Sequence, residues 1–371
     1  MRIVPQSSEV LSCEDFLILV ETAGRTCYKS QDAVTPDSAA SFVNKLLNNM
    51  HLAMLEHATF TFYLPIFLVP YPESEILPFG EVSVLNPSGV GRLGTKVYYD
   101  ALVTTNLRVI IEHRLSKLLG IISAEYQDNM AIQSVCQAIT GFWAANDGYV
   151  DPHSDNWAAQ PQAGLMNRDK WADLFAALDS PVGLGGSHPA VRFMSDREYE
   201  KHLFLSVKFI TNRGVTHEIV RHRRFSFAQE STRYCNYSKD KFGSEITVTD
   251  IRPVLNSVYG TTSADTDKIY SLWEQQMEDA ERTYLSLVSD CNASAQIARS
   301  VLPNSLKAEI IVTGSLSQWK HFHGLRYLGL TGKPHPEMQE LANNLFEGVF
   351  TYFAEEDNID YLVKTYPHIF R

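Results

Sequence analysis

Apolar residues recur along the chain with two spacings, one typical of helices and one typical of strands. The helical spacing predicts helices over residues 14–22, 38–48, 107–121, 132–143, 216–224, 265–289, 293–301, 316–325, 336–353 and 359–366. Runs of aromatic and β-branched residues predict strands over residues 2–4, 58–64, 96–104, 202–210 and 245–248. We expect the strand at 58–64 to be half-buried, because Phe60 and Phe62 alternate with polar Thr61 and Tyr63.

The order of these elements predicts the fold class. Strands and helices alternate without a regular strand–helix–strand rhythm, which favours a mixed α/β (α+β) fold with a largely antiparallel central sheet and flanking helices. Residues 65–95 are rich in proline and glycine and predict a long excursion, and a turn is expected at 212–214. The stretch 146–188 is rich in Asp, Asn, Gly and Pro. We interpret approximately 111–200 as an insertion within a single domain spanning 1–371.

Charge and cysteine content narrow the classes of partner. The 371 residues include 32 Lys and Arg against 43 Asp and Glu, a net charge of −11. This balance disfavours nucleic acid, whose binding needs many cations, but allows one small phosphate in a local basic pocket. Five cysteines without a C-x-x-C pair predict a reduced, intracellular protein. The longest apolar run near the start, Phe16–Val20, is too short for a signal or membrane segment, so we expect no membrane partner and a cytoplasmic location.

Two motifs resemble known binding sites but lack the required context. Gly89, Gly91 and Gly94 spell G-x-G-x-x-G, yet a strand-like segment follows where a dinucleotide site needs a helix. We interpret them as a glycine-rich turn. His217 and His222 are five residues apart and lie about 140° apart around a helix, so they cannot share a metal from one face. No metal site is predicted.

A cluster of cations stands out at residues 216–234, in a chain that is acidic overall. It contains four consecutive basic residues, Arg221, His222, Arg223 and Arg224, followed by Arg233. One interpretation is a basic helix end, where cations complement the helix dipole. The other is a phosphate site, because hydroxyl and amide side chains lie between the arginines and forked guanidiniums bind phosphate well.

The second interpretation gains support from a resemblance. Arg221-His222-Arg223, seven residues and then Ser231 resemble the R-H-R-x7-S signature of the flavin-dependent thymidylate synthases. Further blocks follow the order of that family: Arg25-Thr26-Cys27-Tyr28, then Glu56-His57-Ala58-Thr59-Phe60-Thr61-Phe62 with His51 before it, Ala298-Arg299-Ser300-Val301-Leu302-Pro303, Phe322-His323-Gly324-Leu325-Arg326 and His335-Pro336-Glu337. The chain departs from the family at two places: Gln229 replaces the common glutamate, and Ser315-Leu316-Ser317 replaces Asn-x-Arg.

The resemblance implies an activity, namely reductive methylation of dUMP to dTMP. It implies FAD as cofactor, with NADPH and methylenetetrahydrofolate as co-substrates, and a homotetramer whose sites are shared between subunits. By position, Arg326 is the implied catalytic residue. The implied dUMP contacts are Glu218, Arg221, Gln229, Glu230, Ser231, Thr232, Arg233, Arg299 and Arg326. The implied FAD contacts are His51, Arg221, His222, Arg223, Ser315, Ser317 and His321.

Other interpretations remain. Taken singly, Arg299 could be a cation at a helix end and His321 a surface residue, so the joint order of the blocks carries the hypothesis. A folate-dependent synthase of the Pro-Cys-x-His type is rejected, because none of the five cysteines has that context. A nucleotide- or nucleic-acid-binding relative without catalysis stays open, although the net charge argues against a polymer.

Overall fold

The computed structural model describes residues 1–11, 15–67, 81–84, 91–93, 96–146, 164–167, 170–171, 198–260 and 264–349, referred to below as the described ranges. The predicted helix at 359–366 lies outside them, as does the end of the one at 336–353. The described residues form three β-sheets, and every strand pair is antiparallel except β1 with β10. The predicted mixed fold with largely antiparallel sheet is therefore confirmed.

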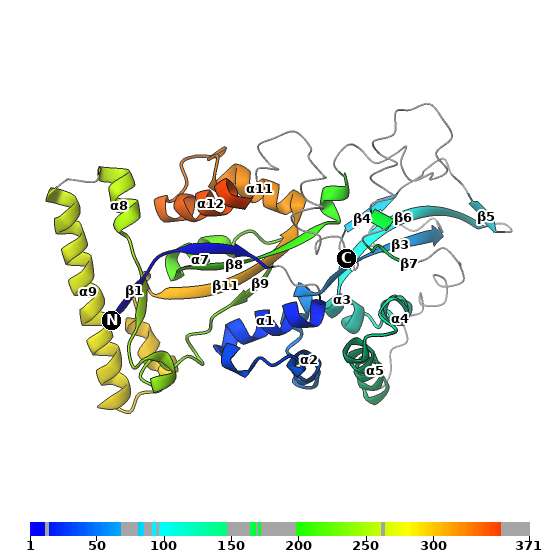
Figure 1. Ribbon diagram of the computed structural model, residues 1–371, viewed down its shortest axis with the longest axis horizontal. Coiled ribbons are helices and arrows are strands. Elements are labelled where there is room, and N and C mark those ends of the chain that lie inside the picture. The colour runs from blue at the N-terminus through cyan, green and yellow to red at the C-terminus, as the bar shows by residue number, and fades with distance from the viewer. Residues whose placement is uncertain are drawn as a thin grey trace.

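The first sheet has four strands and lies at the centre of the molecule (Figure 1). Its order is β2 (Ser7–Val10), β8 (Phe204–Asn212), β11 (Lys307–Ser315) and β9 (Ser226–Gln229). Helices α11 (Leu316–Arg326) and α12 (Pro336–Val349) lie on one side of it, and α1 (Phe16–Tyr28) and α2 (Ser38–Asn48) lie on the other. The core on the α11 side includes Phe209, Trp319 and Phe322, all at most 1% exposed.

The second sheet extends from the first toward the right of Figure 1. Its order is β4 (Glu81–Val84), β6 (Lys96–Asn106), β3 (Thr59–Phe67) and β7 (Gly164–Leu165), and β5 (Gly91–Leu93) also pairs with β6. Strand β6 begins two residues after Gly94, so a strand follows the glycine motif as predicted, but Gly91 itself begins β5, so this part of the motif is a strand and not a turn. Helices α3 (Leu107–Glu112), α4 (Ser116–Glu125) and α5 (Met130–Ala145) continue this part of the chain.

The third sheet joins the N-terminal strand to a strand from the later part of the chain. Strand β1 (Arg2–Val4) pairs in parallel with β10 (Thr247–Thr249). Helices α8 (Arg252–Tyr259), α9 (Ala264–Ser289) and α10 (Ala295–Ala298) pack nearby. The short 3₁₀ helices are η1 (Gln31–Ala33), η2 (Leu52–His57), η7 (Glu198–Lys201), η8 (Asp240–Phe242) and η9 (Arg299–Val301). No described helix has both the length and the apolar character needed to cross a membrane.

Several predicted elements change in the structure. The single helix expected at 107–121 is two helices, divided at Arg114, whose φ of +53° cannot continue a helix. The strand expected to be half-buried is covered on both faces, because Thr61 is 3% exposed and its hydroxyl bonds to Thr104 at 2.7 Å. The sequence does not predict strands β2, β4, β5, β7, β9 and β11.

Candidate functional site

Residues 213–225 are called the basic segment below. They begin where strand β8 passes directly into a short helix, α7 (Arg213–Ile219). Asn212 lies at the junction, and its side-chain oxygen accepts a hydrogen bond from the backbone N–H of Val215 at 2.8 Å. This N-cap replaces the predicted turn at 212–214. The predicted helix at 216–224 is also wrong in its bounds, because α7 ends at Ile219. Residues 221–224 therefore lie in turns after the helix, which removes the interpretation of a basic last helical turn.

Phe225 anchors the far end of this segment in the core. Its ring lies 4.7 Å from that of Trp319 and passes directly over the backbone of Gly314 in β11. A Cβ at Gly314 would come within 2.2 Å of the Phe225 ring, so only glycine allows this approach. The basic segment is thus held at both ends, by α7 and by Phe225.

Arg326, near the end of α11, meets two residues of the basic segment. Its Nη1 pairs with Glu218 at 2.9 Å, and its Nε donates to Nε2 of His222 at 3.1 Å. The His222 ring also lies 4.9 Å from Phe322 and 6.3 Å from His321. Burial, the Arg326 guanidinium and His321 together lower the pKa of His222 to about 4. The structure therefore brings four predicted site residues, Glu218, His222, His321 and Arg326, into one group.

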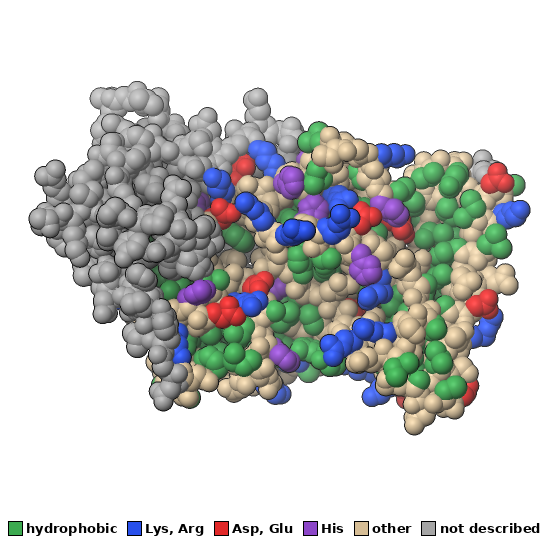
Figure 2. Space-filling view, turned by 180° about the vertical axis from the view of Figure 1, so that it is seen from behind, with side chains coloured by type: hydrophobic (Ala, Val, Ile, Leu, Met, Phe, Trp, Pro, Cys, Tyr) green, Lys and Arg blue, Asp and Glu red, His purple; other side chains and the backbone are tan. Residues whose placement is uncertain are grey.

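Arg221 and Arg223 flank His222 and are exposed. Within the described ranges, neither guanidinium pairs with a carboxylate, so both remain available to an anion. Figure 2 shows Lys, Arg and His side chains gathered near the middle of the face seen from behind. Two cations that pair with no carboxylate in the described ranges, beside a neutral imidazole, match the needs of a diphosphate joined to a planar ring.

A second group of predicted residues follows β9. Gln229 donates to the hydroxyl of Thr216 at 2.9 Å, and the N–H of Ser231 donates to the carbonyl of Cys27 at 3.0 Å. The guanidinium of Arg299 lies 3.5 Å from the hydroxyl of Thr232, and Arg233 is exposed. The structure thus brings four predicted residues into one cationic region, called the Ser231 corner below: Ser231, Thr232, Arg233 and Arg299.

Glu230 differs from its neighbours, because its side chain is directed inward. It is 3% exposed, accepts hydrogen bonds from Tyr237 at 3.2 Å and pairs with Lys307 at 3.0 Å. Its backbone N–H donates to the carbonyl of Glu309 at 2.8 Å. The carboxylate is therefore engaged within the protein, where it positions the Ser231 turn, and its predicted contact with substrate stays untested.

His51 contacts neither group directly, but two tyrosines link it to the residue after Arg233. The Nδ1 of His51 is 3.1 Å from the hydroxyl of Tyr28, and the Tyr28 ring lies 5.4 Å from that of Tyr234. These residues line a pocket of about 480 Å³ together with Phe42 and Lys45. The sequence alone does not single out the two tyrosines, although Tyr28 ends the Arg25–Tyr28 block and Tyr234 directly follows Arg233.

The two serines at the start of α11 have different surroundings. Ser315 is 1% exposed and caps the helix in a capping box with Gln318, whereas Ser317 is half-buried. The hydroxyl of Ser315 is therefore occupied by the helix end. Among the described residues, no hydrogen bond or ion pair joins His51, the Ser231 corner and the Arg326 group directly, and Tyr28 and Tyr234 lie between His51 and the corner. No cluster of His, Cys, Asp or Glu suited to a metal occurs in the same ranges.

Comparison with known proteins gives a family match. The sequence pattern of the family described as thymidylate synthase complementing protein matches residues 10–68 and 199–353, more than half of the chain. Unmatched residues 69–198 include most of the predicted insertion, whose bounds stay a prediction.

Individual relatives match shorter segments. The flavin-dependent thymidylate synthase of Corynebacterium efficiens is 31% identical over 118 residues, 31% of this chain and 46% of the relative. That of Geobacter sulfurreducens is 35% identical over 155 residues, 42% of this chain and 57% of the relative. The chain thus spans about half the length of the curated relatives it matches.

Among solved structures, the UMP/dUMP methylase PolB from Streptomyces cacaoi, bound with 5-Br dUMP, overlaps with a TM-score of 0.34 and 23% identity. The overlap covers 41% of this chain and 68% of that one, and a score this low supports no inference here. The matched ranges contain every block quoted from the sequence, from Arg25 to Glu337. On this match the chain belongs to the thymidylate synthase complementing protein family.

Proposed function

We propose that the protein catalyses the reductive methylation of dUMP to dTMP, with methylenetetrahydrofolate as carbon donor and NADPH as reductant. The observation that carries this proposal is the fixed guanidinium of Arg326, held by Glu218 and His222 at the end of α11. A fixed guanidinium facing the imide edge of a uracil ring would stabilise the negative charge that develops on the ring during attack. The names of the relatives support the same activity.

The Ser231 corner supplies the proposed phosphate site. Arg233 and Arg299 offer two guanidiniums, and Ser231 offers a hydroxyl beside them. Charge-assisted hydrogen bonds of this kind hold phosphates in a defined orientation. These side chains would bind the substrate by its phosphate and so position the ring, while Ser231 would act as a ligand and not as a nucleophile.

The residues beside Arg326 fit FAD. Arg221 and Arg223 would hold the diphosphate, and His222, His321 and His51 would contact the rest of the cofactor. When bound and reduced by NADPH, FAD would supply the hydride for the reaction. The chain's own part is to bind and orient these groups, and the buried rings of Phe322 and Phe225 support the His222 ring from the core side.

We further propose a homotetramer with shared sites. The Arg326 group, the Ser231 corner and His51 form separate groups on one chain, and a neighbouring subunit could complete each of them. Light scattering should give the mass of four chains. A monomeric mass with full activity would contradict this proposal.

A cytoplasmic location remains our proposal as well. The four cysteines in the described ranges, Cys27, Cys136, Cys235 and Cys291, are all free thiols. Free thiols suit a reducing compartment. Fractionation of cells that express the protein would test this.

The decisive experiment supplies dUMP, methylenetetrahydrofolate, NADPH and FAD to the purified protein and measures dTMP. We expect a yellow protein with a flavin spectrum and dTMP that appears only when dUMP, methylenetetrahydrofolate and NADPH are all supplied. A folded, flavin-loaded protein that binds dUMP but forms no dTMP would instead support a catalytically silent nucleotide-binding relative.

A further inference from the structure

Five charged side chains meet behind the Ser231 turn, three of them lysines and two of them glutamates. Lys307 pairs with Glu230 at 3.0 Å and with Glu309 at 2.9 Å. Lys208 pairs with Glu309 at 3.2 Å, and Lys29 contacts both glutamates. All five side chains are at most 23% exposed, so this lysine–glutamate cluster is largely shielded from water.

The cluster carries more positive than negative charge. Burial raises the pKa of Glu309, but Lys307 and Lys29 outweigh burial and bring it down to about 2. Burial also lowers the pKa of Lys307, but Glu230 and Glu309 outweigh it and raise the value overall. For Lys29, burial dominates and the pKa is lowered. Each lysine has a carboxylate partner, but three ammonium groups against two carboxylates leave one positive charge in surplus, which is costly in a shielded place.

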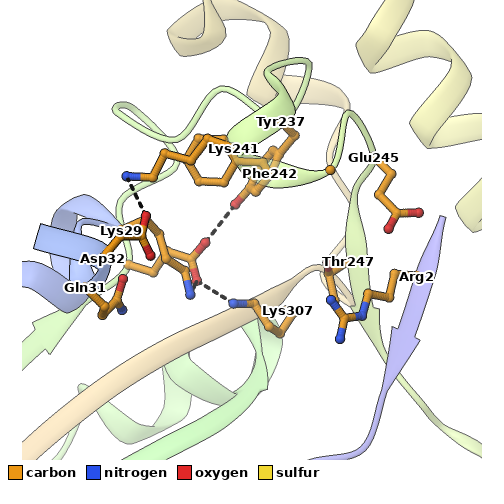
Figure 3. Close-up of a pocket in the computed structure, with 12 residues that line it drawn as sticks. Arg2, Lys29, Gln31, Asp32, Tyr237, Lys241, Phe242, Glu245, Thr247 and Lys307 are labelled. Atoms are coloured by element: carbon orange, nitrogen blue, oxygen red, sulfur yellow. Dashed lines mark hydrogen bonds and ion pairs between the residues drawn. The ribbon is translucent and has the colours of Figure 1, made fainter.

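A pocket of about 330 Å³ opens directly onto this cluster. Lys29, Lys307 and Glu230 form part of its wall, and two further cations reach it from other elements, Arg2 from β1 and Lys241 from η8 (Figure 3). In Figure 3 the Arg2 side chain extends beside Thr247 on the side where Lys307 lies. No carboxylate pairs with the Arg2 guanidinium among the described residues.

The acidic groups on the pocket wall do not neutralise these cations fully. Glu230 belongs to the cluster, and Glu245 pairs with the amino group of Met1 at 3.3 Å. Asp32 lies 3.8 Å from Lys241, but its side chain is 83% exposed, where an ion pair is weak. Arg2 and the surplus ammonium therefore remain for a ligand.

We propose that this pocket binds a phosphate group, either inorganic phosphate or the phosphate of a small monoester. A guanidinium and ammonium groups converging from separate elements suit a dianion, whose charge would also balance the cluster. The volume lies at the lower end of ligand pockets, which favours a small ligand. Neither Ser231 nor Arg233 lines this pocket, so it is a second anion site, independent of the proposed function.

The test measures binding of inorganic phosphate to the full chain by isothermal titration calorimetry, in a buffer free of other anions that bind arginine. The variants are Arg2→Gln and Lys241→Gln, both exposed and so expected to fold. The matched control is Arg282→Gln, an exposed arginine on α9 that pairs only with Asp279 among the described residues. We expect Arg2→Gln to weaken binding at least tenfold, Lys241→Gln to weaken it less, and Arg282→Gln to leave it unchanged.

A second set of titrations separates this site from the Ser231 corner and identifies the source of phosphate. Phosphate binding that persists in Arg233→Ala supports the pocket, whereas its complete loss there would overturn the proposal. Equal binding by wild type, Arg2→Gln and Arg282→Gln, or no binding at 10 mM phosphate (about the weakest affinity of interest), would also overturn it. Glycerol 1-phosphate is the monoester probe: tighter binding than inorganic phosphate assigns the site to an ester, and weaker binding assigns it to the free ion.

Discussion

The Nε of Arg326 donates a hydrogen bond to Nε2 of His222 at 3.1 Å. A ring nitrogen that accepts this bond must be unprotonated, which agrees with the lowered pKa of His222. The other arm of the guanidinium pairs with Glu218. The plane of the Arg326 guanidinium is therefore fixed by two partners, one on α7 and one in the turn that follows it. The arginine is thus oriented before any ligand binds.

Replacing Arg326 with lysine should keep the positive charge but remove the planar, forked guanidinium. We expect kcat for dTMP formation to fall about 10²-fold or more, as for the loss of a donor that stabilises a transition state. Lysine can still pair with Glu218, so the fold should hold. Arg282→Lys on α9 is the control and should retain full activity. A rate within twofold of wild type for Arg326→Lys would exclude the proposed catalytic role.

Arg233→Ala and Arg299→Ala should each weaken dUMP binding while flavin is retained. Each loses a charge-assisted bond to phosphate worth about 1.5–3 kcal/mol, or roughly 10–100-fold in affinity. Titration with dUMP measures the affinity, and the flavin absorbance of the purified variants measures cofactor content. If FAD and dUMP were lost to the same extent in a folded variant, the two arginines would not belong to the phosphate site.

Stability should fall as the solution is acidified below neutral pH. Burial lowers the pKa of His57 to about 4 and, with Lys201, that of His202 to about 3. In the unfolded chain both histidines take up protons near pH 6.5, whereas in the folded protein both side chains remain uncharged at that pH. Their contribution to stability is therefore complete above pH 6.5 and declines from there toward pH 4. Between pH 7 and pH 5 we expect a loss of about 1–2 kcal/mol for each histidine.

Urea unfolding at the two pH values measures this loss. His57→Gln should remove part of the pH dependence, because glutamine does not titrate. His113→Gln, at an exposed position, is the control and should keep the wild-type slope. An unchanged slope in His57→Gln would show that His57 does not contribute.

Phe209→Ala should destabilise the protein by about 3–5 kcal/mol, because a fully buried aromatic ring leaves a cavity that its neighbours cannot fill. Phe209 is 0% exposed and lies 6.2 Å from Trp319 and 6.4 Å from Phe322. Val258→Ala, at 45% exposure on α8, should change stability by less than about 0.5 kcal/mol. Thermal or denaturant unfolding would compare them, and similar midpoints would contradict the assignment of this core.

The sequence predicts much of the fold, and its failures have a common cause. Helix α2 has the predicted bounds, because its apolar residues repeat with helical spacing on one buried face. Strand β11 was missed because eight of its nine residues are buried, so it shows no alternation of polar and apolar positions. Strand β9 lies within the cationic cluster at 216–234, where the sequence shows no strand pattern, and its strand geometry depends on pairing with β11.

For the site, the order of the motifs predicts the family, but it does not predict which side chains contact one another inside the protein. Glu230 lies in a motif, so it was singled out, whereas its partners Lys29 and Lys307 lie far away in sequence. Only the folded sheet brings them together. The same holds for Arg326 and His222, which are 104 residues apart and were linked in advance only by the resemblance.

Strand β11 connects the proposed phosphate pocket with the helix that carries Arg326. Lys307 at its start belongs to the lysine–glutamate cluster, and Ser315 at its end caps the helix that carries Arg326. The two ends are roughly 26 Å apart at strand spacing, and neighbours on both sides hold the strand in register. A registered strand can shift only by whole residues and not by small increments. Occupancy at one end should therefore leave affinity at the other unchanged, and the two ligands should bind additively.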